Sequence, residues 1–378
     1  MARGATFVGL DIGTSGIRAV QLRHRKGGAE IVRAASVELP RGAIKNGTIA
    51  DRKAVVKALK QLWKRGRFGT RKVVFGLADS GVLTRQVDLP WMPPADFRST
   101  LRYQLADALP VDLGSVEIDY HLLAEYERTD DNGQAMPMNR ILVVAASRDA
   151  ILADAGVLRK AGLRPFMADS SAFALIRASC QGEVPDDGVA HALADIGAEQ
   201  LTVVIHQGGQ PRFIRTIANL GGETATQAVA DSLGLDAEEA EALKRETGLN
   251  GPVPVVAPIA ESTVFGSAPM DEALPVDPRT AATLEAINPW ATTVIGEIRN
   301  SLDYFQASAP ETPIQSLTLV GRTAELDGLV ERISTQIPVR VQPMDPHAGL
   351  ATSRRVARAD VPDTRLAVAT GLALAVPA

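Results

Sequence analysis

The chain contains the same short pattern twice, and this repeat constrains its fold more than any other feature of the sequence. Residues 7–22 read FVGLDIGTSGIRAVQL, and residues 191–206 read HALADIGAEQLTVVIH. Each copy is an apolar run ending in Asp-Ile-Gly, then small polar residues, then a second apolar run. Two apolar runs that flank a glycine-containing turn are typical of a β-hairpin. The sequence therefore predicts two hairpins of the same design, one in each half of the chain.

The two turns carry chemistry that suits a nucleotide. A carboxylate at the end of the first strand of each hairpin, Asp11 or Asp195, can hold Mg²⁺ through water. Exposed turn amides and hydroxyls can cradle phosphates, and the turns supply these from Gly13, Thr14, Ser15 and Gly197. We expect two related halves that close on one nucleotide. The alternative is that the two aspartates only cap their turns.

Length and composition indicate a soluble two-domain protein. A chain of 378 residues exceeds one ordinary core, so we expect a first lobe over 1–185 and a second over 186–378. No run reaches about 18 apolar residues, and the N-terminus has no signal-peptide pattern. Cys180 is the only cysteine, which fits a reducing cytoplasm and a small core residue. The sequence thus predicts a cytoplasmic protein without a disulfide.

Both halves mix strand and helix patterns, so the fold class is α/β. Residues 82–146 are predicted to form a small inserted subdomain, and about 224–288 a helical and loop subdomain. Within the latter, the Pro-, Ala- and Gly-rich residues 248–280 are predicted to be a loop. A helix is expected from about Asn288 to Gln306, and an apolar helix ending near Ala375 closes the chain.

Positive charge is concentrated near the N-terminus. Residues 1–72 carry 17 Lys and Arg against 4 Asp and Glu, whereas the remainder carries 23 against 40. Such a split can indicate an anionic partner or simply a solvated basic face. The predicted helix from Asp51 to Gly66 places its apolar residues on one stripe, which favours core packing over a membrane-surface helix. Aromatic residues are few there, so nucleic-acid binding is not expected.

Six segments, in order and spacing, resemble the actin, sugar-kinase and DnaK-type chaperone superfamily, and within it the PilM family of type IV pilus assembly proteins, which is related to FtsA. The segments are DIGTSGIRAVQL (11–22), RQVDLPWMP (85–93), DIGAEQLTVVI (195–205), FIRTIANLGG (213–222), DAEEAEALK (236–244) and EIRNSLDYF (297–305). This resemblance implies an actin-like two-lobe fold, built from duplicated ribonuclease H-like domains with small inserted subdomains.

The resemblance also implies a binding site for ATP and Mg²⁺. Asp11 and Asp195 would face Mg²⁺ from opposite lobes. Glu241 and Lys244 would flank the adenosine, although an ordinary helix-surface ion pair is an equal alternative. The remaining positions would contact phosphates or form the turns around the nucleotide: Gly13, Thr14, Ser15, Arg18, Gly197, Gly222 and Gly321. Arg18 stands where many relatives carry a phosphate-facing lysine, though it can equally be an exposed strand residue.

One turn departs from the family pattern. The adenosine-side turn usually contains two or three glycines, but here only Gly321 remains, followed by Arg322 and Thr323. Their side chains could crowd the base, or Arg322 could stack on it. Base preference therefore stays open.

Three functions follow from the resemblance. The first is an ATP-binding adapter, recruited to the inner membrane by the N-terminal cytoplasmic peptide of the membrane protein PilN, with ATP shifting lobe closure and homo-oligomers possible. Its expected peptide groove includes Arg85, Leu89, Trp91, Met92 and Tyr103. The second is a metabolite kinase with Asp169 as base, although Asp169 can instead cap a helix. The third is an FtsA-like polymer-forming division protein. Slow ATP hydrolysis stays open in each.

Overall fold

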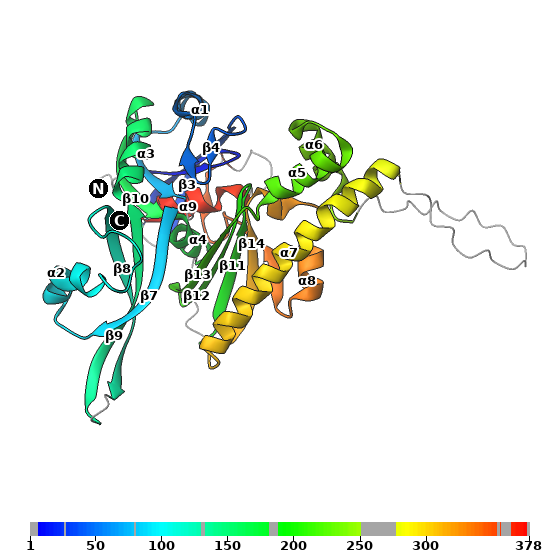
Figure 1. Ribbon diagram of the computed structural model, residues 1–378. Coiled ribbons are helices and arrows are strands. Elements are labelled where there is room, and N and C mark those ends of the chain that lie inside the picture. Colours follow the sequence, from blue (N-terminus) through cyan, green and yellow to red (C-terminus); the bar gives the residue numbers. More distant parts are fainter. Residues whose placement is uncertain are drawn as a thin grey trace, which may run out of the picture.

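The computed structural model describes residues 7–25, 28–78, 81–129, 133–180, 188–250, 277–353, 356 and 364–375. These residues form two lobes, each built on one large β-sheet, and a small third sheet that projects from the first lobe (Figure 1). The predicted α/β, actin-like two-lobe architecture is confirmed.

The first sheet has the strand order β10-β6-β1-β2-β3-β16. Its antiparallel core comes directly from the first repeat, because β1 and β2 form the predicted hairpin and pair Asp11 with Arg18 in register. β6 and β10 then add in parallel to β1. The strands are β1 (Val8–Gly13), β2 (Gly16–Arg25), β3 (Gly28–Glu38), β6 (Lys72–Leu77), β10 (Arg164–Ser170) and β16 (Ala351–Thr352).

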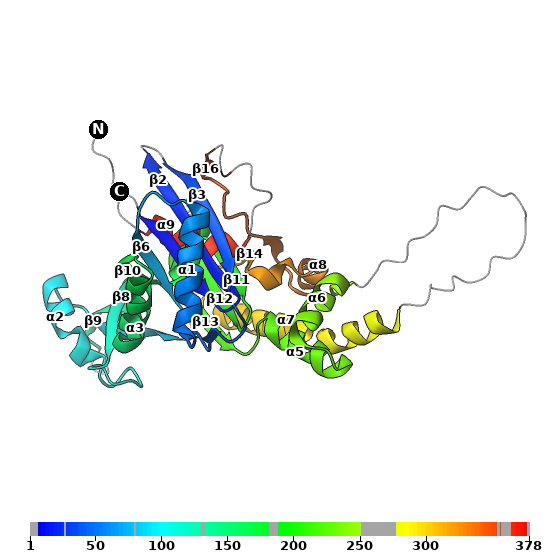
Figure 2. The same ribbon diagram turned by 90° about the horizontal axis from the view of Figure 1, so that it is seen from above.

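Helices α1 (Arg52–Gly66) and α3 (Arg148–Lys160) cover one face of the first sheet (Figure 2). Asp51 caps α1 by accepting hydrogen bonds from the backbone N–H groups of Lys53 and Ala54. The apolar stripe of α1 is buried, with Val55, Leu59 and Leu62 fully inside. This confirms that α1 packs into the core of the lobe.

The second sheet repeats the design in the order β13-β12-β11-β14-β15. The second repeat forms its hairpin, and Asp195 faces Thr202 in the register. The strands are β11 (Ala190–Ile196), β12 (Gln200–Gln207), β13 (Gln210–Ala218), β14 (Ile314–Val320) and β15 (Arg340–Pro343). The helices of this lobe are α5 (Gly222–Leu233), α6 (Ala237–Thr247), α7 (Pro278–Ser308) and α8 (Leu329–Gln336).

Two helices lie between the lobes, α4 (Ser171–Ser179) and α9 (Ala367–Leu374). Their apolar side chains form one core with residues of both sheets, among them Val74 and Val204. Glycine allows the close approach, since a Cβ on Gly371 would lie 1.8 Å from the Ala174 carbonyl oxygen. The apolar C-terminal segment is therefore a central part of the fold, as the sequence indicated.

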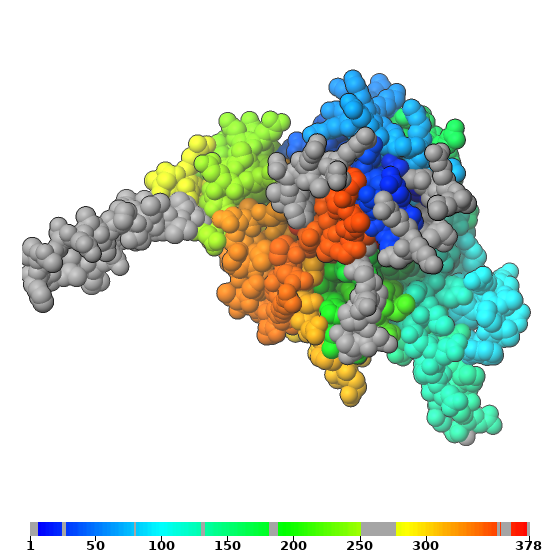
Figure 3. All heavy atoms as spheres, turned by 180° about the vertical axis from the view of Figure 1, so that it is seen from behind, coloured from blue at the N-terminus to red at the C-terminus, as the bar shows by residue number. Residues whose placement is uncertain are grey.

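The C-terminal segment also returns to the first lobe. β16 pairs in parallel with β3, and α9 packs against β1, β2 and β6 of the first sheet. Seen from behind, the orange-red segment that leads into β16 lies against the blue first lobe (Figure 3). The predicted division at 185/186 remains a prediction. β16 and α9 fall within the predicted second lobe (186–378), yet they pack against the first sheet, and no local sequence pattern signals this return.

The projecting subdomain contains β7 (Val82–Pro90), α2 (Pro94–Gln104), β8 (Val116–Thr129) and β9 (Ala135–Ser147). Its sheet has the order β7-β9-β8, and α2 covers one face through Phe97 and Leu101 (Figure 1). In the long β8–β9 hairpin, cross-strand pairing continues through polar residues as far as Thr129 and Ala135.

The long helix α7 begins ten residues before its predicted start, with Asp277 as cap and Pro278 at the first turn. Asn288 and Pro289 resemble a helix start, but Pro289 lies inside the helix. Residues 251–276, most of the predicted 248–280 loop, lie outside the described residues. Among the described helices, including α7, none is long and apolar enough to cross a bilayer.

The remaining elements are short. The loop after β3 contains the two-residue strands β4 (Ile44–Lys45) and β5 (Thr48–Ile49). The 3-10 helix η2 (Arg322–Glu325) follows Gly321 at the end of β14, and η3 (Thr364–Leu366) leads directly into α9.

Candidate nucleotide-binding cleft

The two Asp-Ile-Gly turns line a single cavity between the lobes. This is the central feature of the site, because the turns are far apart in sequence and only the duplicated fold brings them together. Val368 of α9 also lines this cavity. The predicted site residues that line this cavity are Asp11, Gly13, Thr14, Ser15, Arg18, Asp195, Gly197 and Gly321.

Arg18 bridges the first turn. Its Nη1 lies 3.2 Å from Asp11 Oδ2, and its Nη2 donates to Ser15 Oγ at 3.0 Å. Burial raises the pKa of Asp11, and the neighbouring guanidinium of Arg18 opposes that rise. Arg18 therefore compensates the buried carboxylate and lies beside the turn hydroxyls, so a phosphate at this turn would be within reach of its guanidinium.

The second turn depends on Gly321. Its φ of +91° favours glycine, and a Cβ there would lie 2.5 Å from Asp195 Oδ1. The Gly197 carbonyl accepts hydrogen bonds from Gly222 N at 3.0 Å and from Thr323 Oγ1 at 2.9 Å. These bonds hold the Gly197 turn, the start of α5 and η2 in one rigid unit around Asp195.

A larger cavity of about 930 Å³ adjoins the first one. Thr14, Ser15 and Arg322 line both, so the two cavities open into the same cleft. The volume lies within the usual range of ligand pockets, about 300–1,000 Å³. The predicted residues Gly222, Glu241 and Lys244 line this second cavity. The turn residues expected near the phosphates and the residues expected near the adenosine therefore line adjoining cavities.

Lys244 is engaged in the protein itself. Its side chain is only 5% exposed, and Nζ donates to the Gly222 carbonyl (3.0 Å), Thr226 Oγ1 (2.8 Å) and Glu241 Oε2 (2.6 Å). An ammonium group has three protons, and all three are used. Lys244 thus ties α6 to the first turn of α5.

Glu241 presents its other carboxylate oxygen to Arg245, whose Nε lies 3.1 Å from Oε1. Burial alone would raise the pKa of Glu241, but Lys244, Thr226 and Arg245 together hold it below its usual value. Glu241 is therefore ionised at neutral pH, at the wall of the larger cavity.

Arg322 and Thr323, which replace the further glycines of the family turn, both lie at the cleft. Thr323 lines the larger cavity and packs against Gly222, where a Cβ would lie 2.4 Å from Thr323 Oγ1. Arg322 lines both cavities, and its Nη1 lies 3.4 Å from Glu38 Oε1 across the cleft. Its buried Nε has no hydrogen-bond partner among the described residues. Such a donor can bind a polar group of a ligand.

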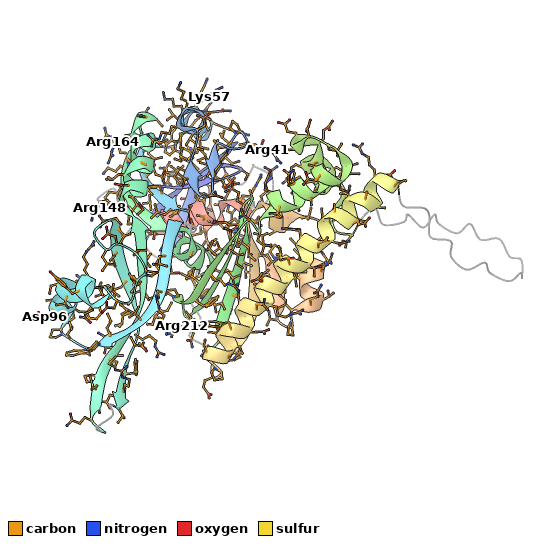
Figure 4. The ribbon with its side chains drawn as sticks, viewed as in Figure 1. Arg41, Lys57, Asp96, Arg148, Arg164 and Arg212 are labelled. Carbon is orange, nitrogen blue, oxygen red and sulfur yellow. The ribbon has the colours of Figure 1, made fainter. Side chains whose placement is uncertain are left out.

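Three contacts cross the cleft and join the end of β3 and the loop after it to the second lobe. Arg41 forms an ion pair with Glu223, and Asn46 N donates to Glu199 Oε2 at 2.9 Å. The Glu38–Arg322 pair is the third. Figure 4 shows Arg41 between the first lobe and the α5–α6 region. Sequence analysis singled out Arg322 but missed all three contacts, since no local signal links positions so far apart in the chain.

The donor set fits a nucleotide with Mg²⁺ better than a metal ion alone. Among the described residues no group of three or more His, Cys, Asp or Glu side chains could hold a metal. Mg²⁺ commonly uses one or two carboxylates plus substrate phosphates and water. Asp11 and Asp195 could supply the carboxylates. The cation of Arg18 suits a phosphate, and the unpaired Nε of Arg322 suits a polar group.

The structure does not bring the five predicted peptide-groove residues together. Leu89 is buried in the core of the inserted subdomain, and Met92 packs against that core. Trp91 and Tyr103 are 45% and 85% exposed. Arg85 lines a cavity separate from the cleft, between the inserted subdomain and the second lobe. Leu89 is thus a core residue, because its side chain faces α2.

Asp169, the possible base, is also occupied. It forms an ion pair with Arg177 of α4 and accepts a hydrogen bond from Ser170 N at 2.8 Å. The N-cap of α4 is Ser170 rather than Asp169, one residue later than predicted.

Cys180 is half-buried, and burial raises the pKa of its thiol, which fits a packing residue.

Comparison with known proteins agrees with this geometry. The family described as type IV pilus assembly protein PilM matches residues 9–264 and 274–376. A solved PilM–PilN type IV pilus biogenesis complex contains a similar chain, with a TM-score of 0.78, 24% identity and 97% coverage of both chains. The cell division protein FtsA of Streptococcus pneumoniae is 22% identical over 359 residues, 90% of this chain and 76% of FtsA. The ethanolamine utilization protein EutJ of Carboxydothermus hydrogenoformans has a TM-score of 0.55 at 14% identity, covering 98% of this chain and 89% of EutJ.

Proposed function

The chain belongs to the PilM family of type IV pilus assembly proteins, and we propose that it acts there as a nucleotide-dependent adapter. In this proposal it binds ATP with Mg²⁺ between its lobes and binds the N-terminal peptide of the inner-membrane protein PilN. The observation that carries the proposal is the meeting of the two Asp-Ile-Gly turns in one cavity that opens into a larger pocket.

The nucleotide would lie across both cavities. Its phosphates would be placed between the two turns, where Arg18 offers a cation and Asp11 and Asp195 offer carboxylates for Mg²⁺. The nucleoside would occupy the larger cavity beside Glu241 and Arg322. Other proposed contacts come from the backbone and hydroxyls of the turns: Gly13, Thr14, Ser15, Gly197, Gly222 and Gly321. Lys244 would act by positioning Glu241 and α5.

Binding of a nucleotide would bias the arrangement of the lobes. A ligand that contacts both turns binds the closed arrangement better than an open one, so it shifts the population toward closure. The Arg41–Glu223 and Glu38–Arg322 contacts at the rim would form only when the lobes are close. Closure is therefore the step by which ATP would change the partner-binding surface.

The partner part of the proposal draws on the PilM–PilN complex among the similar structures. We assign the peptide to a groove formed by the inserted subdomain and the first lobe, with the exposed rings of Trp91 and Tyr103 as contacts. An extended apolar peptide in such a groove is a common recognition mode. PilN would then recruit this chain to the cytoplasmic face of the inner membrane.

The adapter is favoured over a metabolite kinase, because the Arg177 ion pair and the Ser170 hydrogen bond occupy Asp169, the one base that the sequence suggested. A polymer-forming protein stays the second candidate on account of the FtsA similarity.

The test is calorimetric titration of the PilN N-terminal peptide into the purified protein, with and without Mg-ATP. Asp11→Ala serves as the control. We expect micromolar-range peptide binding that changes when Mg-ATP is present and does not change in the variant. Peptide affinity that is the same with and without Mg-ATP would remove the nucleotide dependence. Absence of peptide binding would remove the adapter function.

A further inference from the structure

One face of the first lobe carries a dense group of positive side chains, which we call the basic face. It consists of α1, the loop after it, the start of β6, the end of α3 and the start of β10. All of its Lys and Arg residues are exposed: Arg52, Lys53, Lys57, Lys60, Lys64, Arg65, Arg67, Arg71, Lys72, Arg159, Lys160 and Arg164. Figure 2 looks onto this side and shows α1 and α3 next to each other, and Figure 4 labels Lys57 and Arg164 there.

The cations of the basic face are not held in ion pairs within the described residues. None of its cations forms a salt bridge with a carboxylate in the part of the chain that the structure describes. Arginines elsewhere often do, as in the pairs Arg140–Asp88, Arg177–Asp169 and Arg215–Glu297. Asp51 at the edge of the face is already engaged as the cap of α1. Asp154 of α3 is half-buried, and burial raises its pKa to about 6 while the charge of Arg52 opposes that rise.

The charge pattern of α1 works against the helix. The first turn of a helix favours acidic residues, yet α1 has none there and begins with Arg52 and Lys53. Lys53 and Lys57, and again Lys60 and Lys64, are like charges four residues apart, which destabilises a helix. The helix dipole explains basic residues only in the last turn. The first three turns therefore carry cations that the fold itself does not need.

A hollow of about 600 Å³ lies within the basic face, between the C-terminal ends of α1 and α3. Lys60, Lys64 and Arg71 stand around it, while Trp63 and Phe68 form apolar walls. The two rings pack against each other at 5.0 Å, and the indole N–H donates to the Thr70 carbonyl at 3.1 Å. The hollow thus combines cationic donors at its mouth with apolar walls.

We propose that the basic face binds the anionic headgroups of a phospholipid bilayer. Lys and Arg side chains held near a membrane are attracted by its negative surface potential. The hollow suits one phosphate headgroup with its glycerol, since the donors would meet the phosphate and the rings the carbon skeleton. Leu152 of α3, 54% exposed, adds an apolar contact beside the cations.

Two considerations favour a bilayer over a nucleic acid. Single-stranded nucleic acids are bound by aromatic rings that are free to stack on bases, and Trp63 and Phe68 already pack against each other, with their ring planes tilted by 49°. The second rests on the proposed function, because a partner anchored in the inner membrane would hold this face within reach of headgroups. The basic face would then fix the orientation of the protein at the membrane.

The test is co-sedimentation of the purified full chain with vesicles of phosphatidylcholine alone or with about one third phosphatidylglycerol, without peptide or nucleotide. The test variant is Lys57→Glu, Lys60→Glu and Lys64→Glu together. The matched control changes three exposed arginines away from the face to Glu: Arg98, Arg128 and Arg340. Circular dichroism of both variants verifies that they fold.

We expect the unchanged chain to bind only the anionic vesicles, and to lose at least tenfold in affinity in 0.5 M salt, on the order expected for screened surface charge. The test variant should lose at least tenfold and the control less than twofold. Equal losses in both variants, or no preference for anionic vesicles, would overturn the proposal. So would tighter binding to a short DNA duplex or RNA strand that depends on the same lysines.

This experiment is separable from the test of the adapter function. Vesicle binding together with a failed peptide titration would keep the basic face as a lipid-binding surface and remove the PilN partner. Peptide binding without vesicle binding would keep the adapter and remove the lipid contact.

Discussion

Asp11 and Arg18 face each other across the β1–β2 hairpin, with 3.2 Å between Asp11 Oδ2 and Arg18 Nη1. The corresponding pair in the second hairpin is Asp195 and Thr202, so the second lobe has no cation at this position. The two repeats are therefore alike in backbone and unlike in charge. This asymmetry places a cation beside the first turn and none at the matching position of the second hairpin.

Arg18→Ala should lower both stability and nucleotide affinity. The free energy of unfolding should fall by about 2 kcal/mol, less than a fully buried pair would cost, because both side chains keep some exposure. ATP affinity without Mg²⁺ should fall at least tenfold, and added Mg²⁺ should restore most of it by compensating Asp11. Urea denaturation and calorimetry measure the two effects, with Arg18→Lys as the control. Unchanged ATP affinity in metal-free buffer would contradict the role of Arg18.

Gly321→Ala should abolish the second turn. The new Cβ would lie 2.5 Å from Asp195 Oδ1 and 2.6 Å from the Ile196 carbonyl oxygen, at a φ of +91°. We expect at least tenfold weaker ATP binding and a clear loss of thermal stability. Gly296→Ala is the matched control, because its Cβ meets nothing within 4 Å and a helical alanine should stabilise by about 0.5–1 kcal/mol. If both variants behave alike, the turn is not under the constraint described.

Lys244→Met should destabilise the second lobe. The change leaves the Gly222 carbonyl without its lysine donor and Glu241 with only Arg245 as a cationic partner. We expect the free energy of unfolding to fall by about 2–3 kcal/mol in urea denaturation. Lys60→Met, at an exposed position, should cost less than about 0.5 kcal/mol. A loss no larger than that of Lys60→Met would show that the Lys244 network contributes nothing.

His206 should make the protein sensitive to acid. Burial, assisted by the charge of His191, lowers the pKa of His206 to about 4, whereas an unfolded histidine titrates near 6.5. Below that pH the unfolded chain gains a proton that the folded chain does not, so stability is lost as the pH falls from about 6.5 toward 4. At pH 5 the loss should be roughly 2 kcal/mol.

His206→Gln removes this titration and can keep the hydrogen bond with Ser179 Oγ, which lies 3.2 Å from Nε2. Urea denaturation at pH 7 and pH 5 should give a difference in stability that is about 2 kcal/mol smaller in the variant. An equal pH difference in both proteins would exclude His206 as the source.

The architecture could be predicted because the repeat is local. Each Asp-Ile-Gly hairpin is encoded by apolar runs and a glycine turn within about 16 residues, and both hairpins form as expected. The return of β16 to the first sheet and the approach of Gly371 to Ala174 depend on contacts between distant parts of the chain. No window of sequence contains that information. The predicted start of α7 near Asn288 is wrong for a related reason, since the true cap, Asp277, lies eleven residues before Asn288 beside a segment with no periodicity.

The candidate site divides in the same way. The turn residues follow from the motif, and they line one cavity. The internal use of Lys244 depends on the α5 backbone, and the Glu38–Arg322 contact joins residues 284 positions apart. The groove prediction grouped Leu89 with Trp91 because they are neighbours in sequence, but burial separates them. Motifs therefore located the cleft, and only the fold shows which side chains are open to a ligand.

The central claim is that the two hairpins together bind one nucleotide, and calorimetric titration of Mg-ATP into the purified chain tests it most directly. The account predicts one site per chain, with affinity reduced at least tenfold by Asp11→Ala and also by Asp195→Ala, because each lobe supplies one carboxylate. Absence of ATP binding, or affinity unchanged in both variants, would contradict it.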